Sequence, residues 1–389
     1  MSGVLLILNT GSSSVKFALH DATGHDRIAH GAIEGVGRTP SLTLHDGEGK
    51  QTLQPDLEDN GDMGALIDWL LGVLEEKFGP LDLVGAGHRV VHGGRDFDGP
   101  ARITDEVMST LEALCPLAPG HQPYNLLGIR AIAARWPDCP QIACFDTAFH
   151  RTRPRHTQLF ALPRALSDEG ILRYGFHGLS YDHIAAQLPE ILGPTMAQGR
   201  VIVAHLGSGA SLCAMRRRQS VDTTMGFTAL DGLMMGTRCG QIDPGVLLHL
   251  MREKGMEADA LERLLGKESG LQGVSGISSD MRDLLGSSAP EAAEAVTLFV
   301  HMIQTHIGAL SATLGGLDAL IFTAGIGERS PVIRSKVMAG LGWLGLQPDE
   351  DANSANVTRI SQPESRVTAA MIPTDEEGVI LRALLDKRG

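Results

Sequence analysis

The chain has 389 residues, of which 43% are hydrophobic and 20% charged, which is ordinary for a globular protein with room for two domains. Its formal net charge of −13 argues against a nucleic-acid-binding protein, which would carry a basic surface. The first apolar run, Val4–Leu8, is too short for a membrane span and lacks the basic flank of a signal peptide, so we expect a buried strand. The five cysteines form no CxxC pair, and reduced thiols in a cytoplasmic protein are the simplest interpretation.

Two segments about half a chain apart share a pattern of apolar strand, Gly/Ser-rich turn and second strand. In the first, Val4–Asn9 precedes the turn at 10–14, and in the second, Val201–His205 precedes the turn at 206–210. The pattern predicts two β-hairpins and favours a duplicated two-domain fold. Amides, hydroxyls and Lys16 around the first turn suit phosphate oxygens, although a polar hairpin with an incidental lysine is the simpler alternative.

Further apolar runs predict strands that end in polar or glycine-rich segments. They are Asp82–Ala86 before the segment 87–94, Gln141–Cys144 before Asp146, and Ala319–Thr323 before a Gly-rich turn at 325–330. Strands mixed with helices, with polar loops at the strand ends, indicate an α/β fold that binds ligands at those ends. No GxxxxGK[ST] motif is present, which excludes a P-loop.

Helical patterns occur in the last third of the chain. Apolar residues at helical spacing between Val296 and Leu310 predict a core helix. Thr374–Glu377 has the capping-box pattern, with Thr374 as the N-cap and Glu377 bonded back to it, before a short amphipathic helix. This arrangement would leave Glu376 free for a metal ion.

Two arginines and two histidines are candidate functional residues because they lie in glycine-rich segments. Arg89 and Arg238 have the planar guanidinium that suits carboxylates and phosphates, although a surface ion pair is the commoner role. His121 and His177 both occur at glycine-rich breaks. The other histidines near these loops are interpreted as structural: His88, His150 and His205. No HExxH or CxxC framework accompanies them, which disfavours a zinc hydrolase.

At these motifs the sequence resembles the acetokinase family of the actin–hexokinase–heat-shock-chaperone ATPase superfold. The resemblance runs the whole length and includes Asn9–Lys16, Gly87–Gly94, Phe145–His150, Arg173–Gly178, His205–Ser211, Gly232–Gly245, Ser278–Arg282, Phe322–Glu328 and Pro373–Glu377. It implies a kinase that transfers the γ-phosphoryl of ATP reversibly and directly in line to the carboxylate of acetate, giving acetyl phosphate and ADP. The family implies Mg²⁺ as the metal, with Mn²⁺ as a substitute.

The resemblance also implies the architecture. We expect an α/β protein with two actin-like (ribonuclease H-like) domains, each with a mixed sheet flanked by helices, and an active site in the cleft between them. The N-terminal domain would span 1–148 with the helix 376–389 packed back on it, and the nucleotide-binding domain would span 149–375. The family further implies a homodimer, and we expect neither nucleic acid nor a membrane as a partner.

Residue roles follow from the resemblance, position by position. The metal ligands would be Asn9 and Glu376. The substrate would be bound by Arg89, Val91 and Phe176. The catalytic residues around the transferred phosphoryl group would be Asp146, His177, Arg238 and His121. The nucleotide would be bound by Ser12, Lys16, His205, Leu206, Gly207, Ser208, Gly209, Asp280, Met281, Arg282, Gly325, Ile326, Gly327, Glu328 and Arg329.

The acceptor determines what these residues must do. A carboxylate is already ionised at neutral pH, so no general base is needed, and Asp146 is expected to position the acceptor or the metal. The main obstacle is bringing an anion to a polyanion, which clustered cations address.

Several positions depart from the family pattern, among them Gln122 and Asp231, and four of them bear on how ligands would be bound. Ser208 replaces an asparagine, and Arg329 replaces the asparagine that ends the family's GIGEN motif. Gly120 and Ala229 are smaller than the usual residues. If Gly120 and Ala229 line the acyl pocket they enlarge it, and an added methylene is worth about 1–3 kcal/mol in an apolar pocket. We therefore expect propionate to be accepted comparatively well, and a propionate or other short-chain fatty acid kinase is the alternative.

Two more distant alternatives share the superfold. A sugar kinase would need an aspartate base that faces a hydroxyl. An actin-like or chaperone-type ATPase would have no use for the combination of Arg89, His177 and Arg238.

Overall fold

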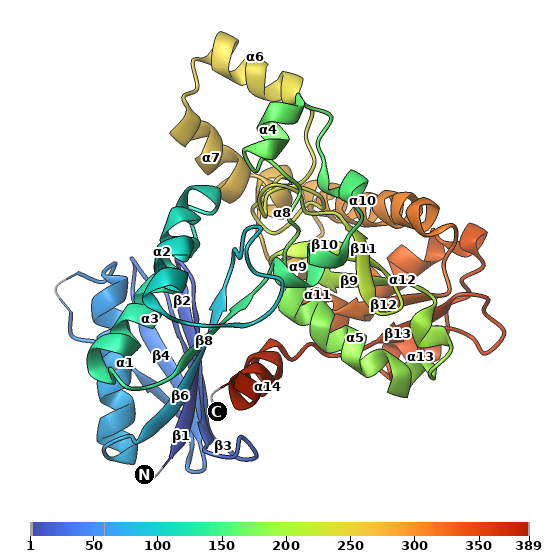
Figure 1. The fold of residues 1–389 in the computed structure, drawn as a ribbon. Helices are drawn as coiled ribbons and strands as arrows, with labels where there is room; N and C mark the ends of the chain where they lie inside the picture. The colour runs from blue at the N-terminus through green and yellow to red at the C-terminus, as the bar shows by residue number, and fades with distance from the viewer. Residues whose placement is uncertain (1–2, 58, 388–389) are drawn as a thin grey trace. The chain divides into compact units, whose positions relative to one another are not determined.

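The computed structural model describes residues 3–57 and 59–387 and divides the chain into two compact units. The first unit is Met1–Phe149 with Asp375–Gly389, and the second is His150–Thr374. Each unit is a β-sheet with helices packed against it (Figure 1). The α/β class expected from the sequence is confirmed.

The first unit contains an eight-stranded sheet in the order β5-β4-β3-β2-β1-β6-β8-β7. Strands β1 to β5 are antiparallel neighbours, whereas β6 is parallel to β1 and β8. The strands are β1 Val4–Thr10, β2 Ser14–Asp21, β3 Arg27–Glu34, β4 Ser41–Asp46, β5 Gly49–Leu53, β6 Leu83–Val90, β7 Ala101–Arg102 and β8 Gln141–Phe145.

Helices cover both faces of this sheet. The helices of the unit are α1 Met63–Phe78, α2 Asp105–Ala113, α3 Gln122–Arg135 and α14 Glu376–Lys387, with a 3₁₀ turn at Cys115–Leu117 and another that begins at Ala148. Leucines of α1 and Ile132 of α3 form one core with alternate residues of β1 and β2. On the opposite face, Ile380 and Leu384 of α14 lie against the glycines of β6, as Figure 1 shows for the red helix beside the sheet.

The second unit contains a five-stranded sheet in the order β11-β10-β9-β12-β13. Strands β9, β10 and β11 are antiparallel neighbours, whereas β12 is parallel to β9 and β13. The strands are β9 Arg200–Leu206, β10 Ala210–Arg216, β11 Gln219–Thr223, β12 Ala319–Thr323 and β13 Thr368–Met371. The helices are α4 Arg164–Asp168, α5 Gly178–Leu192, α6 Pro244–Lys254, α7 Ala258–Lys267, α8 Gly270–Ser275, α9 Met281–Gly286, α10 Pro290–Leu314, α11 Ala324–Arg329, α12 Pro331–Ala339 and α13 Glu350–Ser354, with 3₁₀ turns at Arg155–Gln158, Met196–Gln198 and Gly342–Leu344.

The two sheets share a topology. The run β3-β2-β1-β6-β8 in the first unit has the same sequence of antiparallel and parallel neighbours as β11-β10-β9-β12-β13 in the second. The two predicted hairpins are β1–β2 and β9–β10, which occupy equivalent places. The predicted duplication is therefore visible in the strand order.

The predicted core helix is α10. Among the described residues it is the one helix with the length and apolar composition of a membrane span. It buries Phe299, Ile303 and Ile307 and packs against β10 and α8, as the core helix of a globular domain does.

Three local predictions were wrong. Gly87–Val90 belongs to β6, because the pairing with β8 continues from Gly87 to Val90.

The expected turn at 325–330 is mostly the helix α11. Glu328 accepts from the amide of Ala324 at 2.8 Å, and Arg334 of α12 donates to the carbonyls of Gly327 and Glu328. Isolated glycines are tolerated in a helix whose end groups are bonded in this way.

The third wrong prediction is the capping box before α14. Asp375 caps the helix by accepting from the amide of Gly378 at 2.8 Å, and Thr374 instead donates its amide to Glu328 at 3.0 Å. Glu377 binds the buried His20 of β2, with 2.9 Å between Oε1 and Nε2. The bonds of Thr374 to Glu328 and of Glu377 to His20 therefore replace the predicted capping bonds.

Candidate functional site

The first hairpin is closed by a bond from the amide of Gly11 to the carbonyl of Ser14 at 2.8 Å. Asn9 and Lys16 are directly opposite each other on β1 and β2, so their side chains lie on the same face of the sheet. Ser12 is exposed at the turn between them. The structure therefore brings three of the predicted site residues together at one end of this sheet.

Arg89 lies on β6 beside two predicted site residues. Its Nε and Nη2 donate to the carboxylate of Asp146 at 3.1 and 2.5 Å, and its Nη1 donates to Asn9 Oδ1 at 3.2 Å. Asp146 follows β8 and is 2% exposed in its side chain, against 19% for Arg89. The arginine has five N–H donors, so the three bonds leave two for an incoming carboxylate.

The charges around Arg89 favour its cationic form. Burial by itself would lower the pKa of Arg89, but the Asp146 carboxylate, with a smaller contribution from Glu376, raises that pKa above its ordinary value. The electrostatic effect of Glu376 on Arg89 also indicates that the start of α14 lies near this cluster. Four predicted residues thus form one group in the first unit: Asn9, Arg89, Asp146 and Glu376.

The oxygen atoms of this group suit a hard divalent cation. Mg²⁺ is usually held by one or two carboxylates together with water and substrate phosphates, and Asn9, Asp146 and Glu376 supply oxygen ligands only. Across residues 3–57 and 59–387, no group of three or more His, Cys, Asp and Glu side chains is placed to hold a metal by itself. The donor set therefore fits a magnesium ion that takes some of its ligands from these side chains and the others from a phosphate and water.

Polar side chains of α3 hold the loops around this group, and they are not among the residues predicted from the sequence. The buried Asn125 donates to the carbonyl of Thr10 and accepts from the amide of Val91 at 2.9 Å. The buried Gln122 accepts from the amide of His92 at 3.1 Å. A polar pair spaced by three residues on the buried face of a helix was the signal that could have found them.

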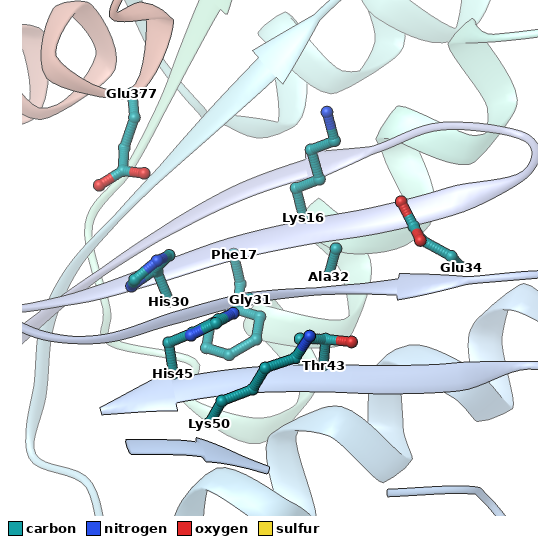
Figure 2. A pocket seen from close by; sticks show the side chains of 10 residues that line it. All are labelled: Lys16, Phe17, His30, Gly31, Ala32, Glu34, Thr43, His45, Lys50 and Glu377. Carbon is teal, nitrogen blue, oxygen red and sulfur yellow. The ribbon is translucent and has the colours of Figure 1, made fainter. Parts of the chain in front are cut away.

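Lys16 also lines a pocket of about 470 Å³ on the β2–β5 part of the sheet (Figure 2). The pocket contains the stacked rings of His30 and His45, whose centroids are 5.0 Å apart. Burial, with Arg27 and His45 nearby, lowers the pKa of His30. Glu377 reaches the rim of the pocket from α14, where His20 and Arg27 bind it.

In the second unit, His177 and Arg238 face one glycine-rich turn. A Cβ atom on Gly209 would lie 3.2 Å from Arg238 Nη2 and 3.2 Å from His177 Nε2. The turn is closed by a bond from the amide of Gly207 to the carbonyl of Gly209 at 2.9 Å. We call Gly207–Gly209 with these two side chains the phosphate cradle, after the role that is proposed for it below, because a glycine-rich turn faced by an arginine and a histidine suits an anion.

Each side chain of the cradle is fixed by contacts with other residues of the second unit. His177 occupies the N-cap of α5 in a left-handed conformation, with φ 60°, and stacks on His205 at 4.1 Å between centroids. Arg238 Nη1 donates to the carbonyl of Ala229 at 2.8 Å. Ala229 is therefore bonded to Arg238 through its backbone, which the sequence did not indicate.

The other predicted nucleotide residues lie around the sheet of the second unit. Ser208 accepts from the amide of Gly236 at 3.1 Å through its carbonyl. Asp280 caps α9 and pairs with the exposed Arg282, and hydrogen bonds from Arg282 lower the pKa of Asp280 to about 2. The residues Gly325, Ile326, Gly327, Glu328 and Arg329 form α11.

Four of the apolar predicted residues have buried side chains. Leu206, Met281, Phe176 and Val91 are each less than 5% exposed. They can contact a ligand through backbone atoms or as the wall of a pocket. His121 is half-buried and forms the N-cap of α3 without a side-chain capping bond.

The histidines interpreted as structural have the expected partners. His88 binds Gln141 at 2.7 Å, and burial lowers the pKa of His88 to about 4. His150 binds Ser220 at 2.8 Å and the carbonyl of Phe176 at 2.9 Å. His205 binds Ser180 at 2.8 Å through Nδ1.

The sequence profile of the acetokinase family matches residues 4–382. The chain belongs to the acetokinase family. Its relatives include the acetate kinase of Rhodopseudomonas palustris strain CGA009, which is 52% identical over 388 residues covering 98% of each chain. The acetate kinase of Methylocella silvestris is 49% identical over 401 residues covering 100% of this chain and 99% of the relative.

Two solved structures are similar to the chain over nearly its whole length. The crystal structure of Porphyromonas gingivalis acetate kinase is 38% identical, with a TM-score of 0.88 and 99% of each chain covered. A propionate kinase from Francisella tularensis is 35% identical, with a TM-score of 0.92 and coverage of 99% of this chain and 100% of that one. The acetokinase fold, with two mixed sheets, is therefore that of this chain.

Proposed function

We propose that the chain transfers the γ-phosphoryl group of ATP to the carboxylate of acetate, giving acetyl phosphate and ADP, and catalyses the reverse reaction. The observation that carries the proposal is 52% identity over 98% of both chains to a protein named acetate kinase. The chemistry of the two residue groups supports it independently. One group presents a guanidinium beside oxygen ligands, and the other presents a guanidinium and an imidazole above a glycine-rich turn.

Arg89 would bind the acetate carboxylate with the two N–H groups that Asp146 and Asn9 leave unused. Asp146 would orient this guanidinium and needs no proton, since acetate is ionised at neutral pH. Asn9 and Glu376 would hold Mg²⁺, which when bound neutralises part of the charge on the ATP phosphates.

Arg238 and His177 would donate to the equatorial oxygens of the phosphoryl group as it moves in line between the two anions. Lys16 and Ser12 at the first hairpin would donate to phosphate oxygens, and His121 would act beside them. The ATP would be bound by the turn 206–209, by Asp280–Arg282 and by α11. We further propose that the protein is a cytoplasmic homodimer.

A hydroxamate assay for acyl phosphate tests the proposal. It is run with MgATP and acetate, propionate, butyrate or no acid, with EDTA added to a parallel series. We expect acyl hydroxamate with acetate, none without an acid, and loss of product in EDTA that excess Mg²⁺ restores. ATP hydrolysis without acyl phosphate would contradict the proposal and would favour an ATPase.

A propionate kinase is the second candidate. The similarity to the Francisella tularensis propionate kinase and the absence of a side chain at Gly120 favour it. Acetate remains the proposed substrate because the most similar relatives described above are acetate kinases. A higher kcat/KM for propionate than for acetate in the same assay would reverse this order.

A further inference from the structure

Three side chains form a hydrogen-bonded chain behind the phosphate cradle. His177 Nδ1 lies 2.8 Å from Ser211 Oγ, and Ser211 Oγ lies 2.5 Å from the phenol oxygen of Tyr181. Tyr181 follows His177 by one turn of α5, and Ser211 is on β10. Both Ser211 and Tyr181 are 0% exposed, so the chain is shielded from water.

One order of the protons in this chain satisfies both of its hydrogen bonds while the phenol stays protonated. Burial raises the pKa of Tyr181 well above its ordinary value, so the phenol keeps its proton. Ser211 has a single hydroxyl proton and contacts two groups. If Tyr181 donates to Ser211, the serine proton is available to His177 Nδ1, which then accepts.

The tautomer of His177 matters because Nε2 faces the cradle. The point where a Cβ on Gly209 would lie is 3.2 Å from both His177 Nε2 and Arg238 Nη2. A protonated Nε2 would donate to an anion at this point, whereas a bare Nε2 would direct its lone pair at the anion. The tautomer therefore decides whether His177 attracts or repels the phosphoryl group.

We propose that Tyr181 and Ser211 are positioning residues that hold His177 in the neutral Nε2–H tautomer, with Nε2–H aimed into the phosphate cradle. The proton order is Tyr181 to Ser211 to His177 Nδ1. The purpose assigned to this tautomer rests on the proposed kinase function. The tautomer itself can be measured without any turnover.

His150 offers an internal reference in the same unit. Its Nδ1 lies 2.8 Å from Ser220 Oγ, like that of His177 from Ser211, and its Nε2 lies 2.9 Å from the carbonyl of Phe176. A carbonyl only accepts, so Nε2 of His150 must carry the proton. Burial, with Arg153 nearby, lowers the pKa of His150 to about 3, so this ring is neutral at pH 7.5.

The first experiment is long-range ¹H–¹⁵N NMR of the full chain labelled with ¹⁵N-histidine, at pH 7.5 without nucleotide. His177→Gln and His150→Gln assign the two rings. We expect His177 to show the same Nε2–H pattern as His150, and Ser211→Ala to convert it to an averaged pattern. An Nδ1–H pattern in the unchanged protein, or no change in Ser211→Ala, would overturn the proposal.

The second experiment is the kinetics of Tyr181→Phe and Ser211→Ala. We expect kcat to fall about tenfold, as is common when a partner that orients a functional histidine is removed, with the KM for ATP and acetate within about twofold. Ser365→Ala is the matched control, since Ser365 is a buried serine of the same unit that accepts from Gln347 and donates to the carbonyl of Val367.

The control separates positioning from general destabilisation. If Ser365→Ala lowers kcat as much as Ser211→Ala at equal loss of stability, the positioning role is wrong. If the unchanged protein makes no acyl phosphate, the proposed function fails, while the NMR result still decides the tautomer.

Discussion

Arg238 is the cation of the phosphate cradle, and its guanidinium is divided between two tasks. Nη1 is bonded to the carbonyl of Ala229, and Nη2 points toward Gly209 beside His177. A fixed donor of this kind needs no reorganisation when negative charge develops on a transferred phosphoryl group.

Arg238→Ala should therefore lower kcat by about 10²–10³, the usual loss for one preorganised donor, or about 3–4 kcal/mol of transition-state stabilisation. The measurement is acetyl phosphate formation, with circular dichroism to verify the fold. Arg263→Ala is the control, because Arg263 is an exposed arginine of α7 paired with Glu268. Near-normal turnover in folded Arg238→Ala would show that the assigned role is wrong.

Gly120 permits a test of the acyl pocket without a packing penalty. A Cβ at Gly120 would meet no atom within 4 Å, so Gly120→Leu should fold normally. If Gly120 lines the pocket, the variant should lower the kcat/KM ratio of propionate to acetate by about tenfold or more, given about 1–3 kcal/mol per methylene. Gly99→Leu is the matched control, since a Cβ there also meets no atom within 4 Å. An unchanged ratio in Gly120→Leu would remove Gly120 from the pocket.

At the scale of elements, α11 depends on one buried arginine. Arg334 of α12 is 0% exposed and donates to the carbonyls of Gly327 and Glu328 at 2.9 and 2.8 Å. It also donates to Asn353 Oδ1 at 2.7 Å and to Asn356 Oδ1 at 2.6 Å. Burial lowers the pKa of Arg334, but an arginine still remains charged at neutral pH.

Arg334→Ala should reduce the free energy of unfolding by about 3 kcal/mol or more, because several buried acceptors lose their donor. Urea unfolding measures this change. Affinity for ATP should fall as well, since α11 is the proposed nucleotide segment. Arg263→Ala again provides the control, with an expected change below about 1 kcal/mol for an exposed pair. Equal stability of the two variants would contradict this account of α11.

At the scale of the whole chain, the last helix, α14, is part of the first unit. Helix α14 packs on β6, where Gly87 has its missing Cβ directed at Ile380 Cγ2, 2.5 Å away. A Cβ atom on Gly85 would likewise lie 3.1 Å from Leu384 Cδ1. These glycines are in β6 because α14 lies too close for side chains, and not because the chain turns there.

Gly87→Ala should lower the melting temperature of the first unit, because its new methyl group overlaps Ile380. Overpacking of this kind typically costs about 1–3 kcal/mol. Gly87→Ala combined with Ile380→Val should recover part of that loss, which a double-mutant cycle measures. Gly72→Ala in α1, where a Cβ meets no atom within 4 Å, should be neutral or stabilising. Strict additivity of Gly87→Ala and Ile380→Val would contradict the contact.

The sequence by itself determined the elements whose signals are local. The two hairpins, the strands that begin at Gln141 and Ala319 and the core of α10 follow from apolar runs, turn residues and helical spacing. Full-length motifs also identified the acetokinase family, which the profile match and the curated relatives confirm.

Only the tertiary structure decided how far β6 runs, what caps α14 and what lies behind His177. Each depends on a partner distant in sequence: β8 for Arg89, His20 for Glu377 and Ser211 for His177. Local pattern describes the preference of a segment for helix, strand or turn. Long-range hydrogen bonds and packing override that preference, because an unpaired buried polar group costs more than a local propensity gains.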